Sequence, residues 1–141
     1  MKRSASAAWS GGLREGSGTV STGTGVLHDA AYGFRSRFED SPGTNPEELL
    51  GAAHAGCYTM ALAAGLEQAG FTAYRVETKA EVTLEKDGDG FAITTVDLTT
   101  RARVPRIDPG TFDKIAQATK EGCPVSKVLK AHITLDARLE E

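Results

Sequence analysis

The chain has 141 residues, with 16 Lys and Arg against 19 Asp and Glu, and a formal net charge of −3. This length supports one domain, which we expect to span residues 1–141. The basic residues are scattered and form no stripe that could follow a phosphate backbone, which argues against a nucleic-acid partner. Only 28 residues are Leu, Ile, Val or Phe, whereas 20 are Ala. A core this thin favours a homo-oligomer whose chains share apolar surface.

The start of the chain and its two cysteines bear on the cellular compartment. Lys2 and Arg3 are followed by Ser and Gly rather than by the apolar core of a secretory signal. Without such a signal, Cys57 and Cys123 argue for thiols in a reducing compartment and against an extracellular disulfide framework. We therefore expect a cytoplasmic protein.

The segment 3–38 is rich in Gly, Ser and Thr. Glycines separate short stretches such as 18–22 and 25–27, a pattern typical of short antiparallel strands. In the last part of the segment, alternation places Arg35 and Arg37 on one face of a strand, with aromatic residues opposite. Two solvated arginines on a sheet surface are the default interpretation of that pair.

A long helix is predicted after Asn45 and Pro46. Asn can cap a helix, and Pro at the first helical position loses nothing by lacking an N–H group. From Leu49 to Leu66 the residues are apolar or small on every helical face, and Gly70 offers a C-cap. We predict a buried helix in a soluble protein. The competing interpretation is a membrane span, which acidic residues at both ends and polar side chains within the stretch disfavour.

A hairpin is predicted next. Alternation over 74–84, a turn at 87–90 and a second strand over 91–104 carry this prediction. The apolar phase of the second strand shifts near residues 94–95, which indicates a β-bulge.

The last third of the chain predicts two helices and a strand. Asp108 before a Pro opens one helix, and Gly122 closes it. Cys123 before another Pro starts a short helix, and alternation over 133–139 predicts the final strand. Three apolar residues of the short helix are expected to point inward: Val125, Val128 and Leu129. This order of elements favours an α+β fold over a βαβ repeat.

The two cysteines are the first candidates for chemistry. Cys57 lies within the apolar helix, where a free Cys is commonly a small hydrophobic residue. Cys123 lies at a helix start, where free N–H groups and the helix dipole stabilise a thiolate, although a small cap residue is equally suited to that position. A separation of 66 positions does not by itself make them a pair.

Two further candidates surround Cys57. His54, three residues earlier, has a metal-ligand spacing that Cys123 could extend, but no CxxC or HxxxH motif supplies a fourth ligand. Glu47 lies ten residues earlier, about 15 Å and about 80° away on one straight helix. Glu47 therefore cannot touch Cys57 unless the helix breaks at Gly51 or a second subunit supplies one of the two residues.

Six segments together match the motifs of one enzyme family. They are GSGTVSTGTGVL, YGFRSRFE, GTNPEELLGAAHAGCYTMAL, GFAIT, IDPGTFDKI and GCPVSKVLKAHITLDARL. In these segments the sequence resembles the OsmC branch (osmotically inducible protein C) of the OsmC/Ohr organic hydroperoxide reductases, along nearly its whole length. The central NPEELLGAAHAGC and the distant GCPVS are specific in combination.

The resemblance implies an α+β fold of the OsmC-like type. This is an intertwined homodimer in which antiparallel sheets wrap around long buried central helices, with an active site at each of two interface clefts. It further implies a thiol-dependent peroxidase that reduces organic hydroperoxides, and more slowly hydrogen peroxide, to alcohols in oxidative and osmotic stress defence. No bound cofactor is implied. The reductant would be an external dithiol, of lipoyl type or on a lipoylated protein, and neither nucleic acid nor membrane is an expected partner.

The resemblance also implies roles for five residues. Cys57 matches the peroxidatic thiol and Cys123 the resolving thiol, which together pass through a sulfenic acid and a disulfide. Arg37 matches the arginine that activates the thiolate, and Glu47 matches the carboxylate that orients this arginine. Glu48 is adjacent and could share the role of Glu47.

Two other functions remain open from the residues alone. The first is a non-catalytic protein that binds a small apolar ligand in a cleft lined by the small-residue helix, with structural cysteines. The second is a metal-binding thiol protein.

Overall fold

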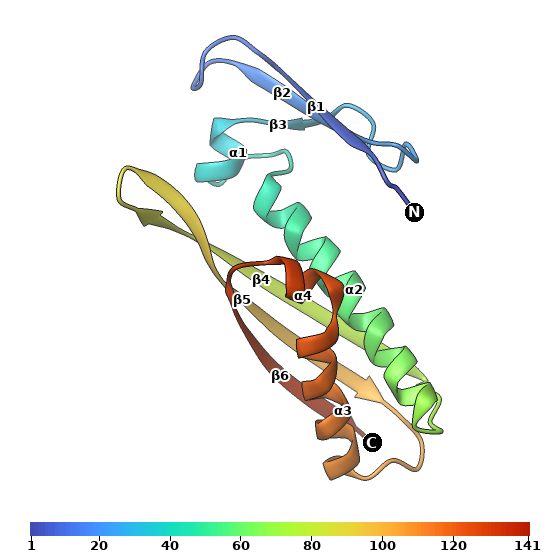
Figure 1. The fold of residues 1–141 in the computed structure, drawn as a ribbon. Coiled ribbons are helices and arrows are strands. Elements are labelled where there is room, and N and C mark those ends of the chain that lie inside the picture. The colour runs from blue at the N-terminus through green and yellow to red at the C-terminus, as the bar shows by residue number, and fades with distance from the viewer. The chain divides into compact units, whose positions relative to one another are not determined.

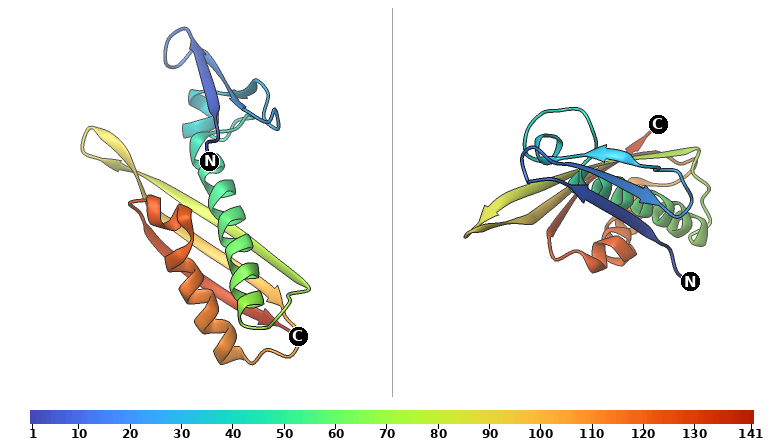
Figure 2. Two further views of the ribbon diagram at one scale, coloured as in Figure 1. Left: turned by 45° about the vertical axis from the view of Figure 1, so that its right-hand side comes forward. Right: turned by 90° about the horizontal axis from the view of Figure 1, so that it is seen from above.

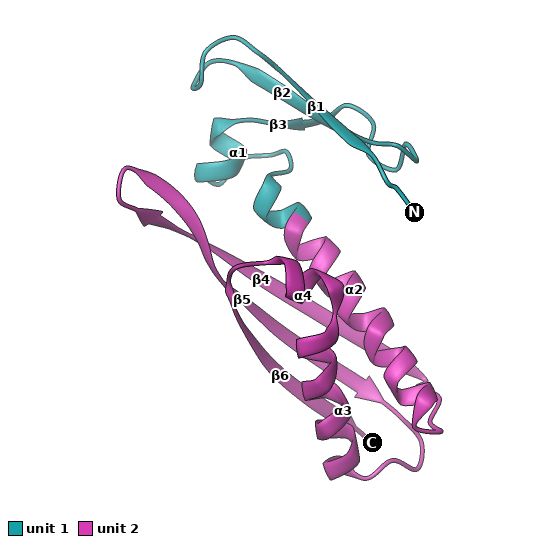
Figure 3. Cartoon of the chain, viewed as in Figure 1, with its two compact units in different colours: residues 1–49 teal, residues 50–141 magenta.

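The computed structural model describes residues 1–141, which form two compact units, 1–49 and 50–141 (Figure 3). The first unit contains β1 (Ala5–Ser10), β2 (Ser17–Thr22), β3 (Ala30–Tyr32) and α1 (Phe34–Phe38). Helix α2 (Pro46–Gln68) begins in the first unit and continues in the second. The second unit also contains β4 (Arg75–Asp87), β5 (Gly90–Arg103), α3 (Pro109–Gly122), α4 (Pro124–Val128) and β6 (His132–Glu140) (Figure 1).

The first unit is built on an antiparallel sheet of order β1-β2-β3. The predicted short strands are confirmed over 18–22, but the strand predicted over 25–27 is wrong. These residues lie in the connection between β2 and β3, where the N–H of Gly25 donates to the carbonyl of Thr22 at 2.9 Å. Gly25 has a φ of +80°, a left-handed conformation that closes a turn and does not extend a strand.

Arg35 and Arg37 lie on helix α1, so the prediction that they share a strand face is wrong. The N–H of Arg37 donates to the carbonyl of Gly33 at 3.1 Å, which is a helical hydrogen bond. The Ser36 hydroxyl accepts a hydrogen bond from the N–H of Gly33 at 2.9 Å and stabilises the start of this turn. Five residues are too few for the sequence pattern to separate a strand from one helical turn.

The predicted start and end of α2 are confirmed. The side-chain oxygen of Asn45 accepts a hydrogen bond from the N–H of Glu48 at 2.7 Å, and Pro46 is the first helical residue. Beyond Gln68, Gly70 has a φ of +92°, the left-handed conformation of a C-cap.

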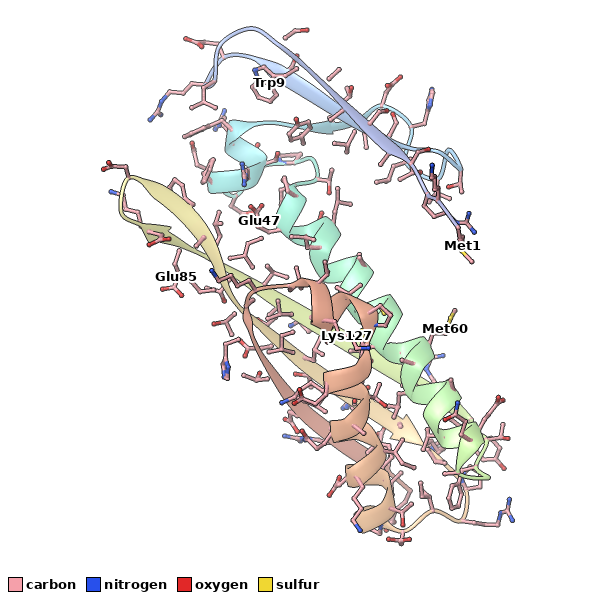
Figure 4. The ribbon with its side chains drawn as sticks, viewed as in Figure 1. Met1, Trp9, Glu47, Met60, Glu85 and Lys127 are labelled. Carbon is pink, nitrogen blue, oxygen red and sulfur yellow. The ribbon has the colours of Figure 1, made fainter.

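In the single chain, α2 is buried along one face only. Tyr58, Leu62 and Leu66 are fully buried in the core, whereas Met60 is 75% exposed and points away from the sheet (Figure 4). By length and composition alone the helix could cross a membrane. Its buried face nevertheless packs as the core helix of a folded unit. The sequence pattern does not reveal the open face, because the residues on both faces are small or apolar.

The sheet of the second unit has the order β4-β5-β6. Strands β4 and β5 form the predicted antiparallel hairpin, with a register shift between Thr83 and Leu84 opposite Thr94. The predicted bulge is therefore confirmed. Strands β5 and β6 pair in parallel, because α3 and α4 cross over between them. This βαβ crossover within the α+β fold differs from the antiparallel sheets that the family resemblance implied.

Helices α2 and α3 lie side by side on one face of this sheet, as both views of Figure 2 show. Gly65 allows their close approach, since a Cβ atom there would lie 3.1 Å from the side chain of Ile115. The Tyr58 hydroxyl donates to the carbonyl of Ala116 at 3.0 Å. The side chains between the helices and the sheet form the core of this unit.

Both predicted helices of the last third are confirmed. The Asp108 side chain caps α3 by accepting a hydrogen bond from the N–H of Thr111 at 2.9 Å. Helix α4 is a single turn that starts after Cys123. Val125 and Leu129 pack against the core as predicted, but Val128 is exposed. The helix ends at Val128 and the backbone becomes extended at Leu129, which turns the Val128 side chain to solvent.

Candidate active site

The two cysteines meet in the second unit. Cys57 lies in the middle of α2, and Cys123 lies between α3 and α4. Their sulfur atoms are 3.0 Å apart, and both thiols are free. Cys123 is fully buried, whereas Cys57 is partly exposed. This contact turns two cysteines that are distant in sequence into one dithiol, poised for disulfide formation after a small movement.

The surroundings of the two sulfurs push their pKa values in opposite directions. Burial raises the pKa of the Cys57 thiol, and the hydrogen bond with Cys123 raises it further. Burial acts in the same direction on Cys123, but hydrogen bonds with Cys57 and with the backbone N–H groups of Ser126 and Val125 outweigh it and lower its pKa. Cys57 therefore needs an additional positive charge to be a thiolate near neutral pH.

An arginine held by a buried carboxylate lies in the first unit. The Nε and Nη2 atoms of Arg37 are each 3.0 Å from Oε1 of Glu47. The Glu47 side chain is 10% exposed and that of Arg37 is 39% exposed, so the carboxylate anchors a guanidinium that still reaches solvent. Both contacts use the same carboxylate oxygen, and the buried Oε2 of Glu47 has no partner within the chain. The remaining N–H groups of Arg37 are free to bind another anion.

Neighbouring charged residues have other partners. Glu48 is exposed and accepts a hydrogen bond from the Thr44 hydroxyl at 3.0 Å, whereas Glu47 contacts the arginine. Arg35 forms an exposed pair with Glu39 at 3.8 Å.

Helix α2 is continuous through Gly51. A Cβ atom on Gly51 would lie 3.4 Å from Val82, an ordinary packing distance, so this glycine packs against β4 within an unbroken helix. The break at Gly51 that the sequence left open is therefore absent.

His54, a candidate metal ligand by sequence, is instead hydrogen bonded to a serine. Its Nε2 atom lies 2.8 Å from the hydroxyl oxygen of Ser126. No group of three or more His, Cys, Asp or Glu residues is arranged to hold a metal ion. Ser126 is the site residue that sequence reasoning missed. Its position three residues after Cys123, in the short helix that Cys123 caps, is the signal that could have identified it.

Comparisons with known proteins agree with the fold and identify the family of the chain. A family model described as "OsmC-like protein" matches residues 38–138. The chain is 55% identical to "Peroxiredoxin OsmC" of Escherichia coli (strain K12) over 132 residues, which cover 94% of this chain and 92% of that protein, and equally to the protein of that name from Shigella flexneri.

Solved structures with the same fold include an OsmC-like protein of unknown function from Vibrio cholerae. It has a TM-score of 0.77 and 15% identity, over 97% of this chain and 99% of that one. The organic hydroperoxide resistance protein OhrB of Bacillus subtilis has a TM-score of 0.67 and 26% identity, over 97% and 98% of the two chains. The predicted α+β fold class is confirmed. The identity to a peroxiredoxin makes this chain a peroxidase, and it belongs to the OsmC-like protein family.

Proposed function

We propose that this peroxidase reduces organic hydroperoxides, and more slowly hydrogen peroxide, to alcohols in oxidative and osmotic stress defence. The observation that carries the proposal is the 3.0 Å contact between the sulfur atoms of Cys57 and Cys123. The names of the related proteins support it, since one is a peroxiredoxin and another confers organic hydroperoxide resistance.

The proposed cycle uses two thiols. The Cys57 thiolate attacks one peroxide oxygen, the O–O bond breaks, and the alkoxide takes a proton and leaves as the alcohol. Cys57 is then a sulfenic acid. Cys123 attacks its sulfur, the S–O bond breaks, and hydroxide leaves as water with the proton that Cys123 releases. An external dithiol, which we propose to be a lipoyl group, free or on a protein, reduces the resulting disulfide by exchange. Peroxiredoxin chemistry of this kind needs no bound cofactor.

Arg37 and Glu47 are proposed to activate Cys57. Burial raises the pKa of Cys57, so a thiolate there requires a cation beside it, and Arg remains charged at any relevant pH. Glu47 would hold the guanidinium in place through the contacts of 3.0 Å already described. Glu48, with its bond to Thr44, is the second choice for that role.

The function is tested by turnover. Purified protein with dihydrolipoamide and an alkyl hydroperoxide should consume many equivalents of peroxide per chain, and hydrogen peroxide more slowly. A non-catalytic binding protein with structural cysteines would remove at most one equivalent under the same conditions. A zinc assay on the same preparation addresses the metal-binding alternative.

We also propose an intertwined cytoplasmic homodimer of a single domain spanning 1–141. The exposed face of α2, together with the start of β4, lines an open groove of about 610 Å³. Its lining is mostly apolar or small and includes Ala55, Gly56, Met60, Ala63 and Tyr74. Met60 and Tyr74 are both largely exposed in the single chain. Such a surface is typical of an interface that a second copy covers.

Sedimentation at low micromolar concentration should therefore give about twice the chain mass of 14.8 kDa. Met60→Glu, which places a charge on the apolar face, should weaken the dimer, whereas Glu67→Gln on the exposed end of the same helix should leave it intact. A folded and fully active wild-type monomer would contradict the proposed dimer.

A further inference from the structure

His54 is a fully buried imidazole that the proposed cycle does not use. Its side chain is 0% exposed. Its Nε2 atom lies 2.8 Å from Oγ of Ser126, and its buried Nδ1 atom has no hydrogen-bond partner within the chain. A neutral imidazole carries one proton, and a hydroxyl can serve Nε2 either as donor or as acceptor. The structure therefore accommodates the neutral ring, at the cost of one unpaired nitrogen.

The protonated ring has no such accommodation. Whichever nitrogen carries the proton in the neutral form, an imidazolium has an N–H group on both nitrogens. The Nδ1–H group would then be a buried donor without an acceptor, in a charged ring removed from water. Burial accordingly lowers the pKa of His54, and it is the only cause of that shift. Protonation therefore favours any movement that brings water to the ring.

No neighbouring charge compensates for a proton on His54. The charged and titratable groups on the surrounding segments are Glu47, Cys57 and Tyr58 on α2, Lys120 on α3, Cys123 and Lys127 at α4, and Lys79 and Glu81 on β4. Glu47 is paired with Arg37 and Glu81 with Lys79. Neither carboxylate contributes to the pKa of the ring.

Helix α4 is the element that can most easily move away from His54. It is a single turn without a fully buried residue, whereas α2 carries much of the core. Two side-chain contacts, three residues apart on each segment, join α2 to this part of the chain. They are the 3.0 Å contact of Cys57 with Cys123 and the 2.8 Å contact of His54 with Ser126. Release of α4 would hydrate His54 and also expose Cys123, which is otherwise fully buried.

We propose that His54 is a proton-sensitive clamp on α4: the neutral ring holds this turn on α2 through Ser126, and protonation in mild acid releases the turn and exposes the thiol of Cys123. Only a proton and hydrogen bonds change in this step. The clamp itself does not depend on the proposed function. Its consequence for the cycle does, because a released Cys123 no longer lies beside Cys57 and disulfide formation slows.

The sign of the pH dependence follows from linkage. The pKa of His54 is lowered in the closed state and returns to about 6.5 when water reaches the ring. Above about pH 6.5 neither state binds the proton, so the opening equilibrium is constant. Below it the open state binds more protons, and opening increases by up to about tenfold for each pH unit, until the closed state is protonated as well.

Amide hydrogen exchange of the reduced wild-type protein, without peroxide, measures this opening. The N–H groups of Lys127 and Leu129 donate to the carbonyls of Cys123 and Val125 at 3.1 and 3.2 Å and report on α4. After correction for intrinsic exchange, their protection should fall about tenfold from pH 6 to pH 5, while the protection of α3 changes little. A pH-independent protection of α4, or an equal loss in α3 and α4, would overturn the inference.

His54→Gln should remove this pH dependence. The amide keeps a donor and an acceptor for Ser126 but does not take up a proton in this range. The matched control is His132→Gln, because His132 is an exposed histidine at the start of β6, shortly after α4. This variant should keep the wild-type dependence. Loss of the dependence in His132→Gln, with its persistence in His54→Gln, would show that the wrong histidine had been chosen.

Alkylation of Cys123 tests the exposure of the thiol separately. In a Cys57→Ser background, the ratio of the alkylation rates with His54 and with His54→Gln cancels the titration of the thiol itself. This ratio should increase about tenfold from pH 6 to pH 5. A constant ratio would contradict the proposed release of α4.

The consequence for the cycle is measured with both cysteines present. After one equivalent of alkyl hydroperoxide, the wild-type protein should form the disulfide more slowly than His54→Gln at pH 5 and at the same rate at pH 7.5. An equal ratio of the two rates at both pH values would contradict an effect of the clamp on resolution. A wild-type protein that forms no sulfenic acid would instead refute the proposed function, and the exchange and alkylation results would still stand.

Discussion

Cys57→Ser removes hydroperoxide reduction completely, whereas Cys123→Ser permits one turnover and then stalls or overoxidises. This expected result follows from the assignment of Cys57 as the attacking thiol and Cys123 as the resolving thiol. Cys57 is partly exposed and can meet a peroxide, while Cys123 is fully buried behind it, 3.0 Å away. Without Cys123 the sulfenic acid has no thiol to condense with and reacts with further peroxide.

Mass spectrometry after one equivalent of peroxide distinguishes the roles. In Cys123→Ser the protein should carry a sulfenic or sulfinic adduct on Cys57, and Cys57→Ser should carry none. This is a stringent test of the assignment, because the contacts within the chain lower the pKa of Cys123 and raise the pKa of Cys57, the thiol assigned to attack the peroxide. An adduct on Cys123 in the Cys57→Ser protein, with peroxide consumed at the wild-type rate, would reverse the assignment.

Local signals predicted most of the elements from α2 onward. The Asn45 cap, the Asp108 cap and the bulge opposite Thr94 each depend on residues close in sequence, and each is found where the pattern placed it. Short segments contain too few residues for such a prediction. The five residues of α1 fit the pattern of one helical turn and also that of a strand. The hydrogen bonds of Ser36 stabilise the helical turn.

Contacts between distant segments could not be predicted from spacing. Cys57 and Cys123 meet because the junction between α3 and α4 lies beside the middle of α2. The family resemblance, and no periodicity in the sequence, indicated this pair. The parallel pairing of β5 with β6 likewise follows from the crossover and leaves no mark in the alternation of either strand. Ser126 was missed because a serine in a one-turn helix has no distinctive pattern until its partner, His54, is placed beside it.

Replacing Arg37 should have the largest effect among the residues outside the dithiol. Arg37→Ala removes both the charge and the fork of N–H groups, and with peroxide limiting we expect kcat/KM to fall by about 100-fold or more, as when an electrostatic stabiliser is deleted from a water-poor site. Arg37→Lys keeps the charge but loses the bidentate geometry and should lie between Ala and wild type. Thiolate absorbance near neutral pH should decrease in the same order, because each pKa unit corresponds to about 1.4 kcal/mol between the protonation states.

Arg35→Ala is the matched control for this series. Arg35 is on the same helical turn, is equally charged, and forms only an exposed pair with Glu39 at 3.8 Å, a type of contact that contributes little to stability. Its activity should stay near that of wild type, so a loss specific to Arg37 cannot come from net charge or from the helix. Wild-type rates in a folded, dimeric Arg37→Ala would mean that the ion pair with Glu47 is structural only. Because burial raises the pKa of Cys57, that outcome would require another cation to activate the thiol.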